Sequence, residues 1–418
     1  MRWLHTSDWH LGRGFHGNSL QEAQQEMLET VCRTAEERDV DVVLVAGDIY
    51  DRALPPEWAV RMLERCLLRL AQADVTVIMT SGNHDSAQRL GFGRGLMAAS
   101  GVHLRTSLED AWTPVEIDDG QQKVLVYGVP YLEPQLYATA LGLPRATHTS
   151  LMGVVVERIW EDVAARRAVL SEETRVRTVL MAHLFAAHGV GSDSERAIGV
   201  DAPSGEVVEH SAETSGGLAV VPLTLFEGFD YTALGHLHGR QRLAPQVRYS
   251  GSPVKYSFSE TSQTKGAWLW DSEDWEEITA LDWTIGRQLS QLVGTLEEVL
   301  HEGTVKALRE DFLQVTLTDR ERPERAFQRV QEAYPHLATF THQPPQHADT
   351  RPTYSQALQR ARTPGQVVDS FLEHVRGRGA GEEENAILEK ALTAARLAAA
   401  GGTELPTGEG PTGSGRES

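Results

Sequence analysis

Short apolar runs alternate with longer amphipathic segments over about the first 283 residues of the chain. The short runs are mostly aliphatic, which predicts strands that are buried on both faces. They are Arg2–Thr6, Val40–Ala46, Val75–Thr80, Lys123–Val129, Val176–Ala182 and Tyr231–Leu234, followed after His238 by Val247–Ser250, Ala267–Trp270 and Glu277–Leu281. The longer segments carry apolar residues at three- and four-residue spacing, which predicts helices at Leu20–Arg38, Pro55–Gln72 and Leu151–Leu170. This alternation predicts a layered α/β sandwich. A Rossmann-like fold would share the chain order, but no G-x-G-x-x-G turn follows the first strand.

A different pattern begins near residue 284. Strands predicted at Gln288–Val293, Phe312–Leu317 and Leu337–Thr341 alternate with helices, one opened by a capping box from Thr295 to Glu298 and one running from Pro323 through Val330. Gln343-Pro344-Pro345 then marks a linker. Beyond it, helices are predicted at Thr353–Arg362, Pro364–Val375 and Glu383–Ala399, and the composition from Gly401 onward is typical of disorder. We therefore divide the chain into residues 1–283, an α+β cap at 284–345, linker and helices at 346–380, and a tail at 381–418.

Metal-binding side chains follow five of the predicted strands, at the carboxyl ends where open α/β sheets bind ligands. A set of carboxylate, imidazole and amide ligands suits Mn²⁺, Fe²⁺ or Zn²⁺. It is too large for one tetrahedral ion and fits two ions that share a carboxylate. Asp48 is the natural bridging ligand, because a carboxylate has lone pairs for two cations. Each such residue taken alone is more often a turn former than a ligand, so the prediction rests on the ordered set. The predicted ligands are Asp8, His10, Asp48, Asn83, His183, His236 and His238.

Composition limits the classes of protein to which the chain can belong. The net charge is −20, from 39 basic and 59 acidic residues, which argues mildly against a generic nucleic-acid binder. We see no apolar stretch near the roughly 20 residues of a membrane span and no secretory signal before Asp8, so we expect a soluble, cytoplasmic protein without membrane contact. Cys32 and Cys66 lie in apolar helical patterns, which favours buried, reduced thiols.

The motifs D-x-H, G-D-x-x-D, G-N-H-D and G-H-x-H occur in this order, and their order and spacing resemble those of the calcineurin-like metallophosphoesterases. Three segments narrow the resemblance to the SbcD family, the nuclease subunits of bacterial SbcCD complexes. They are the run from His5 to Gly12, Tyr249-Ser250-Gly251-Ser252-Pro253, and Ser257-Phe258-Ser259-Glu260. The similarity covers about residues 1–375, including the cap and the helix at 364–375.

The resemblance implies which of the predicted ligands bind each of the two ions. Asp8, His10 and His238 would hold one ion, Asn83, His183 and His236 the other, and Asp48 would bridge them. His84, next to the ligand Asn83, would protonate the leaving oxygen or stabilise the charge of the transition state. Asp51 is expected to orient His84 from its place three residues past Asp48, and not from the resemblance, since archaeal relatives carry His at this position. The ions would be Mn²⁺. The implied activity is exonucleolytic and endonucleolytic cleavage of DNA duplex ends and hairpins, gated by the ATPase SbcC, in nucleoid-associated repair, recombination and replication.

The resemblance also implies two protein interfaces. A homodimer would form through phosphoesterase helices, with Phe92 and Leu96 at the interface, and the helix at 364–375 would dock on the SbcC coiled coil through Val368, Phe371 and Leu372. Apolar stripes of this kind are also found in ordinary cores. Two other functions remain open: a stand-alone metallophosphatase or cyclic-nucleotide phosphodiesterase, whose core would need neither cap nor C-terminal helices, and a non-catalytic scaffold with the same fold.

Overall fold

The computed structural model describes residues 1–143, 146–171, 174–191, 220–345, 363–376 and 379–400. The chain divides into one compact unit that ends at Pro344 and a second that begins at Pro345. The helix predicted at Thr353–Arg362 and the tail from Gly401 lie outside the described residues.

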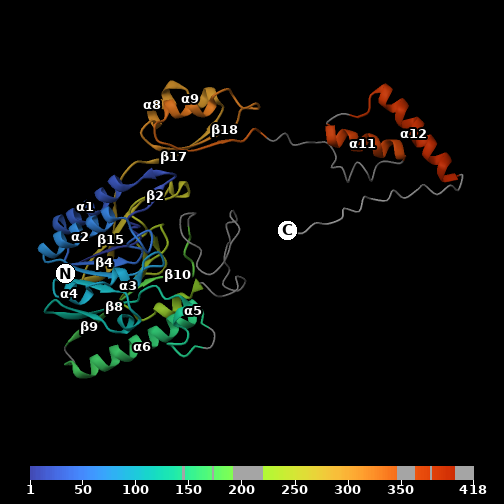
Figure 1. Cartoon of the computed structure of the whole chain (residues 1–418). Helices are drawn as coiled ribbons and strands as arrows, with labels where there is room; N and C mark the ends of the chain where they lie inside the picture. Colours follow the sequence, from blue (N-terminus) through green and yellow to red (C-terminus); the bar gives the residue numbers. More distant parts are fainter. Residues whose placement is uncertain (144–145, 172–173, 192–219, 346–362, 377–378, 401–418) are drawn as a thin grey trace, which may run out of the picture. The chain divides into compact units, whose positions relative to one another are not determined.

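The first unit is built around two six-stranded sheets (Figure 1). In the first sheet, β1, β4, β5 and β6 run parallel, and β15 and β16 extend the β1 side as antiparallel strands. The strand order is β16 (Asp274–Asp282), β15 (Gly266–Asp271), β1 (Arg2–Thr6), β4 (Val42–Ala46), β5 (Thr76–Thr80) and β6 (Val102–Arg105).

The second sheet has a parallel centre with one antiparallel strand at each edge. Its order is β13 (Gln241–Arg242), β14 (Val247–Tyr249), β12 (Tyr231–Gly235), β9 (Arg175–His183), β8 (Gln122–Gly128) and β7 (Val115–Asp118). The central strands of both sheets are buried along most of their length, as their aliphatic sequences predict. The short edge strands β6 and β7 were not predicted. Both alternate buried and more exposed residues, and four residues give too little pattern to recognise from sequence.

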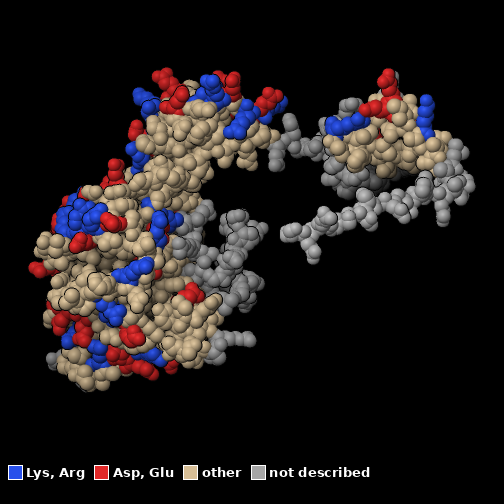
Figure 2. Space-filling model, in the orientation of Figure 1, with Lys and Arg blue, Asp and Glu red and all other residues tan. Residues whose placement is uncertain are grey.

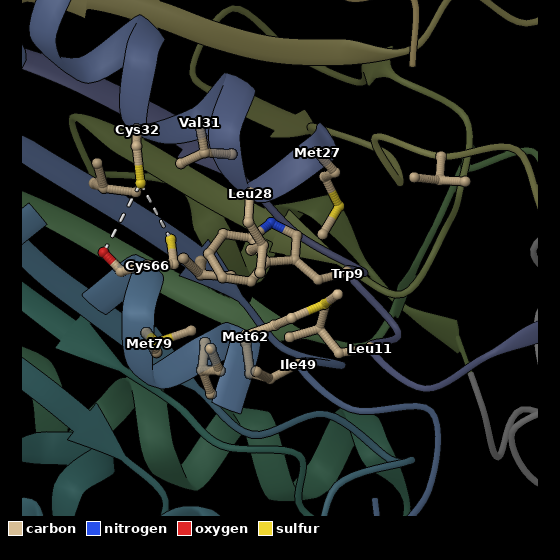
Figure 3. Close-up of a cluster of buried hydrophobic side chains, with 14 of the residues drawn as sticks. Trp9, Leu11, Met27, Leu28, Val31, Cys32, Ile49, Met62, Cys66 and Met79 are labelled. Atoms are coloured by element: carbon tan, nitrogen blue, oxygen red, sulfur yellow. Dashed lines mark hydrogen bonds between the residues drawn. The ribbon is translucent and has the colours of Figure 1, made fainter. Parts of the chain in front are cut away.

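Three apolar clusters define the layers. Trp3, Val42 and Ile78 of the first sheet pack against Val126 and other residues of the second. The outer face of the first sheet is covered by α1 (Gln21–Glu37) and α2 (Glu57–Gln72), and Figure 3 shows their methionine, leucine and cysteine side chains around the buried Trp9 indole. The outer face of the second sheet is covered by α6 (His148–Val169). The order helix, sheet, sheet, helix is that of an α-β-β-α sandwich and confirms the predicted layered α/β fold.

A smaller parallel sheet of β17 (Leu289–Gly294), β18 (Phe312–Leu317) and β19 (Leu337–His342) follows the sandwich. Its helices α7 (Leu296–Val299), α8 (Glu302–Leu308) and α9 (Ala326–Ala333) pack on a separate core. The predicted capping box is present, because the Thr295 hydroxyl accepts from the Glu298 amide and Glu298 accepts from the Thr295 amide. The helix predicted from Pro323 begins only at Ala326.

The second unit contains α11 (Pro364–Arg376) and α12 (Glu382–Ala400). The two helices contact each other, and Arg376 forms a two-pronged ion pair with Glu384 at 2.8 Å. At the start of α11, Thr363 and Gln366 exchange hydrogen bonds between their side chains and backbone amides. None of the described helices combines the length and apolarity that a membrane span needs.

Candidate metal centre

The predicted ligands lie on loops at one end of the two sheets. Asp8 and His10 follow β1, Asp48 follows β4, Asn83 follows β5, His183 ends β9, and His236 and His238 follow β12. Six of them are buried and Asn83 is half-buried. Because parallel strands end at the same sheet edge, residues more than 200 positions apart in sequence meet here.

The backbone at this edge is unusually contorted. Four of the predicted ligands adopt left-handed conformations, which non-glycine residues rarely do. Such conformations each cost roughly 1–3 kcal/mol and cluster at functional sites. They are Asp8 at φ 54°, His10 at φ 44°, Asp48 at φ 51° and His236 at φ 108°.

Two of the motif glycines let the loops approach one another. A Cβ on Gly82 would overlap the Asp48 carboxylate, and one on Gly235 would overlap the backbone carbonyl of Ala46. The glycines of G-N-H-D and G-H-x-H are therefore required by the close packing of neighbouring strand ends.

One group of ligands forms around His10 and His238. Their Nε2 atoms lie 3.0 Å apart, and Asp8 offers a carboxylate oxygen to the same cluster. The Asp8 carboxylate is fixed by the His236 amide at 3.0 Å and by the Ser7 hydroxyl at 2.5 Å. Burial raises the pKa of Asp8 to about 6, although the imidazoles of His183 and His238 oppose the rise.

A second group forms around His183. Its Nδ1–H donates to the Ala46 carbonyl at 3.0 Å, which turns Nε2 toward Asn83 Oδ1 at 2.9 Å and Asp48 Oδ2 at 3.3 Å. The His236 ring stands edge-on to His183, with 5.3 Å between their centroids. A cation bound here would replace the proton on His183 Nε2, and the lone pairs of His183 Nε2, Asn83 Oδ1 and Asp48 Oδ2 would then converge on it.

Asp48 connects the two groups. Its Oδ2 atom lies 3.6 Å from His10 Nε2 as well as 3.3 Å from His183 Nε2. Burial opposes its ionisation, but the charge and hydrogen bond of His183, together with the charges of His10 and His84, outweigh burial and hold the pKa of Asp48 well below its usual value. Burial likewise disfavours a charged His183, but Asp48 outweighs it and raises the pKa of His183 to about 9. The centre therefore has a strong affinity for positive charge.

These residues fit divalent ions. Among the described residues, the ligand atoms fall into overlapping groups of Asp8, His10 and His238, of Asp8, Asp48 and His183, and of His10, Asp48 and His84. Burial lowers the pKa of His10 and of His236 well below the usual value, so their imidazoles are neutral and have lone pairs to offer. Mixed nitrogen and oxygen donors on shared groups are typical of two-metal sites.

His84 lies beside this cluster and is buried. Its Nδ1–H donates to the backbone carbonyl of Asp51 at 2.8 Å, and its Nε2 lies 4.0 Å from Asp48 Oδ2. The sequence predicted that Asp51 would orient His84, and the contact is made by the backbone of Asp51. The Asp51 carboxylate lies 4.0 Å from His84 Nδ1, 3.9 Å from His10 Nδ1 and 3.8 Å from Arg13 Nε.

Sequence reasoning assigned no role to the residues behind His238. The His238 Nδ1–H faces Glu260 Oε1 at 3.3 Å, which directs Nε2 into the cluster. Glu260 is fully buried and pairs with Lys265 at 2.6 Å, and Lys265 also donates to the His238 carbonyl at 2.9 Å. A carboxylate behind a ligating imidazole fixes its orientation and raises its basicity. In the sequence, this region was noted only because Ser257-Phe258-Ser259-Glu260 supports the family resemblance, and no function was predicted for Glu260 or Lys265.

Asp85 was another unassigned residue, although it ends the G-N-H-D motif. Its carboxylate accepts from the amides of Gly82 at 2.9 Å, Ile49 at 3.0 Å and Tyr50 at 2.9 Å. It therefore joins the loop that carries Asn83 to the loop that carries Asp48.

The residues predicted at protein interfaces are not among the candidate metal ligands. Phe92 and Leu96 belong to the segment around α4 (Arg94–Ala98) and are 86% and 83% exposed. On α11, Val368 and Leu372 are half-buried and Phe371 is 48% exposed.

Two family models match the chain. The calcineurin-like phosphoesterase model matches residues 1–240, more than half of the chain. A model described as the type 5 capsule protein repressor C-terminal domain matches residues 286–376. The chain therefore belongs to the calcineurin-like phosphoesterases, and its site is that of a metal-dependent phosphoesterase.

A similar protein of known name identifies the subfamily within the phosphoesterases. The chain is 29% identical over 350 residues to SbcD of Staphylococcus saprophyticus, which is named as part of the nuclease SbcCD, and the match covers 82% of this chain and 85% of the relative. The predicted resemblance to SbcD is thereby confirmed. Among solved structures, a dimetal phosphatase from Danio rerio matches 68% of this chain and 99% of its own, with 14% identity and a TM-score of 0.38, too low to bear on the fold.

Proposed function

We propose that this chain is the nuclease subunit of an SbcCD-type complex, which uses two Mn²⁺ ions to cleave DNA at double-strand ends and hairpins. The observation that carries the proposal is the joint match: a relative named as part of the nuclease SbcCD aligns over 82% of the chain, across both the phosphoesterase and the residues after it. The cluster around Asp48 supplies a ligand set for such chemistry. The proposed setting is DNA repair, recombination and replication at the nucleoid, in the cytoplasm.

The two ligand groups would each hold one ion. Asp8, His10 and His238 would hold one ion, and Asn83, His183 and His236 would hold the other, with Asp48 shared. When bound, two divalent ions supply positive charge that stabilises the phosphate oxygens of an in-line displacement and makes water a better nucleophile. Mn²⁺ accepts both the imidazole and the carboxylate donors of this set.

His84 would act on the leaving oxygen. The Asp51 carbonyl holds its Nδ1–H, so the protonated imidazole would present Nε2–H on the side that faces Asp48. A proton delivered from Nε2 would neutralise the oxygen as the phosphodiester bond breaks. The same imidazolium would stabilise charge on the phosphoryl group before the transfer.

The surface charge indicates how DNA would bind. Figure 2 shows Lys and Arg side chains interspersed with Asp and Glu, without a continuous basic surface on that face. With a net charge of −20, the chain lacks the basic excess of a protein that holds DNA alone. We therefore propose that productive DNA binding relies on the small sheet β17–β19 as an end-recognition cap and on a partner subunit.

Two apolar surfaces would serve the assembly. On α11, Val368, Phe371 and Leu372 would dock on the coiled coil of the ATPase SbcC, in the manner of an amphipathic helix in a groove. Phe92 and Leu96, more than four-fifths exposed, would meet the same residues of a second copy in a homodimer. Single exposed apolar residues are common, whereas two within five residues form a patch that a partner would cover.

The substrate class is tested by comparing three substrates in Mn²⁺: bis-p-nitrophenyl phosphate, mono-p-nitrophenyl phosphate and a labelled DNA hairpin, each with and without SbcC and ATP. The proposal predicts that the hairpin is cut, that the diester is preferred to the monoester, and that SbcC with ATP stimulates duplex cleavage. A chain that hydrolyses the monoester fastest and leaves the hairpin intact under all conditions would be an ordinary phosphatase.

A further inference from the structure

The two cysteines of the chain lie opposite each other on neighbouring helices. Cys32 is on α1 and Cys66 is on α2, and their Sγ atoms are 3.5 Å apart (Figure 3). Both side chains are buried, at 2% and 4% exposure. A disulfide bond is about 2.05 Å long, so the sulfur atoms need to approach by only about 1.5 Å.

A cavity gives this pair access to small molecules. It has a volume of about 160 Å³, lies between α1 and α2, and is lined by both cysteines and by the exposed side chains of Gln25, Glu29 and Arg65. A molecule little larger than water fits in this volume, because one water occupies about 30 Å³ in the liquid. Reduced thiols in a sealed core would have no such route.

The two thiols are not equivalent. The hydrogen bond with Cys66, and next the positive charge of Arg69, lower the pKa of Cys32, although burial opposes the change. The same hydrogen bond, together with burial, raises the pKa of Cys66 well above its usual value. Arg69 is held in place by a two-pronged ion pair with Glu36, at 2.7 Å for each contact. We assign Cys32 as the first sulfur to react, because the positive charge of Arg69 favours its thiolate and the thiolate is the nucleophile.

We propose that Cys32 and Cys66 are a peroxide-reactive dithiol that forms a reversible disulfide between α1 and α2. The Cys32 thiolate attacks one oxygen of hydrogen peroxide, which gives a sulfenic acid and releases hydroxide. The Cys66 sulfur then attacks the Cys32 sulfur, expels the second oxygen as hydroxide and loses its proton. In sum, two thiols and one peroxide give one disulfide and two waters, so sulfur loses two electrons and oxygen gains them.

The disulfide would close a loop of the chain that includes one of the candidate metal ligands. The cysteines are 34 positions apart, and the segment between them contains β4 and Asp48. A cross-link of this span restricts the unfolded chain, so the oxidised protein should unfold at a temperature several degrees above that of the reduced protein.

The test uses the full chain and needs no variant, because Cys32 and Cys66 are the only cysteines. The reduced protein is exposed to hydrogen peroxide and then unfolded in a denaturant that contains N-ethylmaleimide, which blocks any remaining thiols. The product is analysed by intact and peptide mass spectrometry. The expected result is loss of both thiols, a mass lower by two hydrogen atoms, a cross-linked peptide pair, restoration by dithiothreitol, and a raised unfolding temperature.

Several results would overturn the proposal: two thiols that still react after peroxide, oxidation to sulfinic acid without a cross-link, a disulfide between two chains, or a lower unfolding temperature for the oxidised form. Two variants test the order of events. Cys66→Ser should trap Cys32 as a sulfenic acid that reacts with dimedone. Cys32→Ser should leave a thiol whose oxidation is at least about tenfold slower. Equal reactivity in both variants would contradict the assigned nucleophile.

Discussion

Replacing Glu260 by Gln tests whether the residues behind His238 hold that imidazole in position for one particular ion. The substitution keeps the shape of the side chain and one acceptor oxygen, but it removes the negative charge that faces His238 at 3.3 Å and Lys265 at 2.6 Å. Loss of a carboxylate behind a ligating histidine typically weakens metal affinity by about 10- to 100-fold. This corresponds to about 1.4–2.7 kcal/mol.

Stability should fall as well. Removing one partner of a buried ion pair costs roughly 3–5 kcal/mol. Lys265 keeps three other acceptors, namely the His238 carbonyl at 2.9 Å, the Ser252 hydroxyl at 3.0 Å and the Gln263 amide oxygen at 2.8 Å. We therefore expect a loss near the lower end of that range, about 3 kcal/mol at pH 7.

The stability difference should depend on pH in a defined direction. Burial opposes the ionisation of Glu260, but the His238 hydrogen bond and the Lys265 charge outweigh it and hold the pKa of Glu260 far below the ordinary 4.5. A depressed pKa contributes stability that is fully present above 4.5 and is lost as the pH falls toward the folded-state value. The gap between wild type and Glu260→Gln should therefore narrow only below about pH 4.5.

Calorimetric titration with Mn²⁺ distinguishes positioning from general destabilisation. Glu260→Gln should weaken one of the two ions and leave the other near wild-type affinity. The matched control is Asp230→Asn, which removes a partly buried carboxylate bonded to Arg177 and to the Thr178 amide at 2.7 Å, at the opposite end of β12. It should lower stability without changing either metal affinity. Equal weakening of both ions, or unchanged affinities in Glu260→Gln, would leave Glu260 a purely structural role.

Other substitutions test the remaining parts of the centre and the docking helix. Asp48→Ala should abolish phosphodiester cleavage and lower the metal stoichiometry measured by calorimetry, and two ions bound with wild-type affinity would refute its bridging role. His84→Gln should keep both metals and DNA affinity but lose turnover by roughly 10²- to 10⁴-fold; near-normal turnover would remove it from the mechanism. Asp51→Ala should reduce turnover far less than His84→Gln, because the backbone carbonyl that holds His84 remains, and an equal loss would assign the role to the carboxylate. Phe371→Asp with Leu372→Asp should abolish co-purification with SbcC while metal content survives, and retained binding would exclude docking through this helix.

Much of the sandwich follows from the sequence, because its central strands are continuous aliphatic runs. β1 has the predicted bounds, as does β18 of the small sheet, and β4, β5 and β12 differ from prediction by at most two residues. The same runs locate the candidate ligands, since each ligand lies at or just after a strand end. Helices with a weak amphipathic pattern are harder to predict. Helix α8, which has no fully buried residue, was not predicted.

The supporting residues of the site could not be inferred in the same way. Glu260 lies 22 positions after His238 in a short 3-10 segment, and only the folded chain brings its carboxylate behind the imidazole. Asp51 shows the converse, because the sequence suggests a role for its side chain while the contact to His84 uses its backbone. The proximity of Cys32 and Cys66 likewise depends on how α1 and α2 pack, which hydrophobic spacing does not specify.

Cleavage of an end-labelled DNA hairpin by the purified chain together with SbcC and ATP, with Mn²⁺ and then with a chelator, decides whether this chain is a metal-dependent DNA nuclease. We expect that the wild-type chain cuts the hairpin in Mn²⁺, that chelation stops the reaction and added Mn²⁺ restores it, and that Asp48→Ala is inactive throughout. A chain that binds two Mn²⁺ ions and hydrolyses bis-p-nitrophenyl phosphate, yet leaves the hairpin intact with and without SbcC and ATP, would refute the proposed nuclease function.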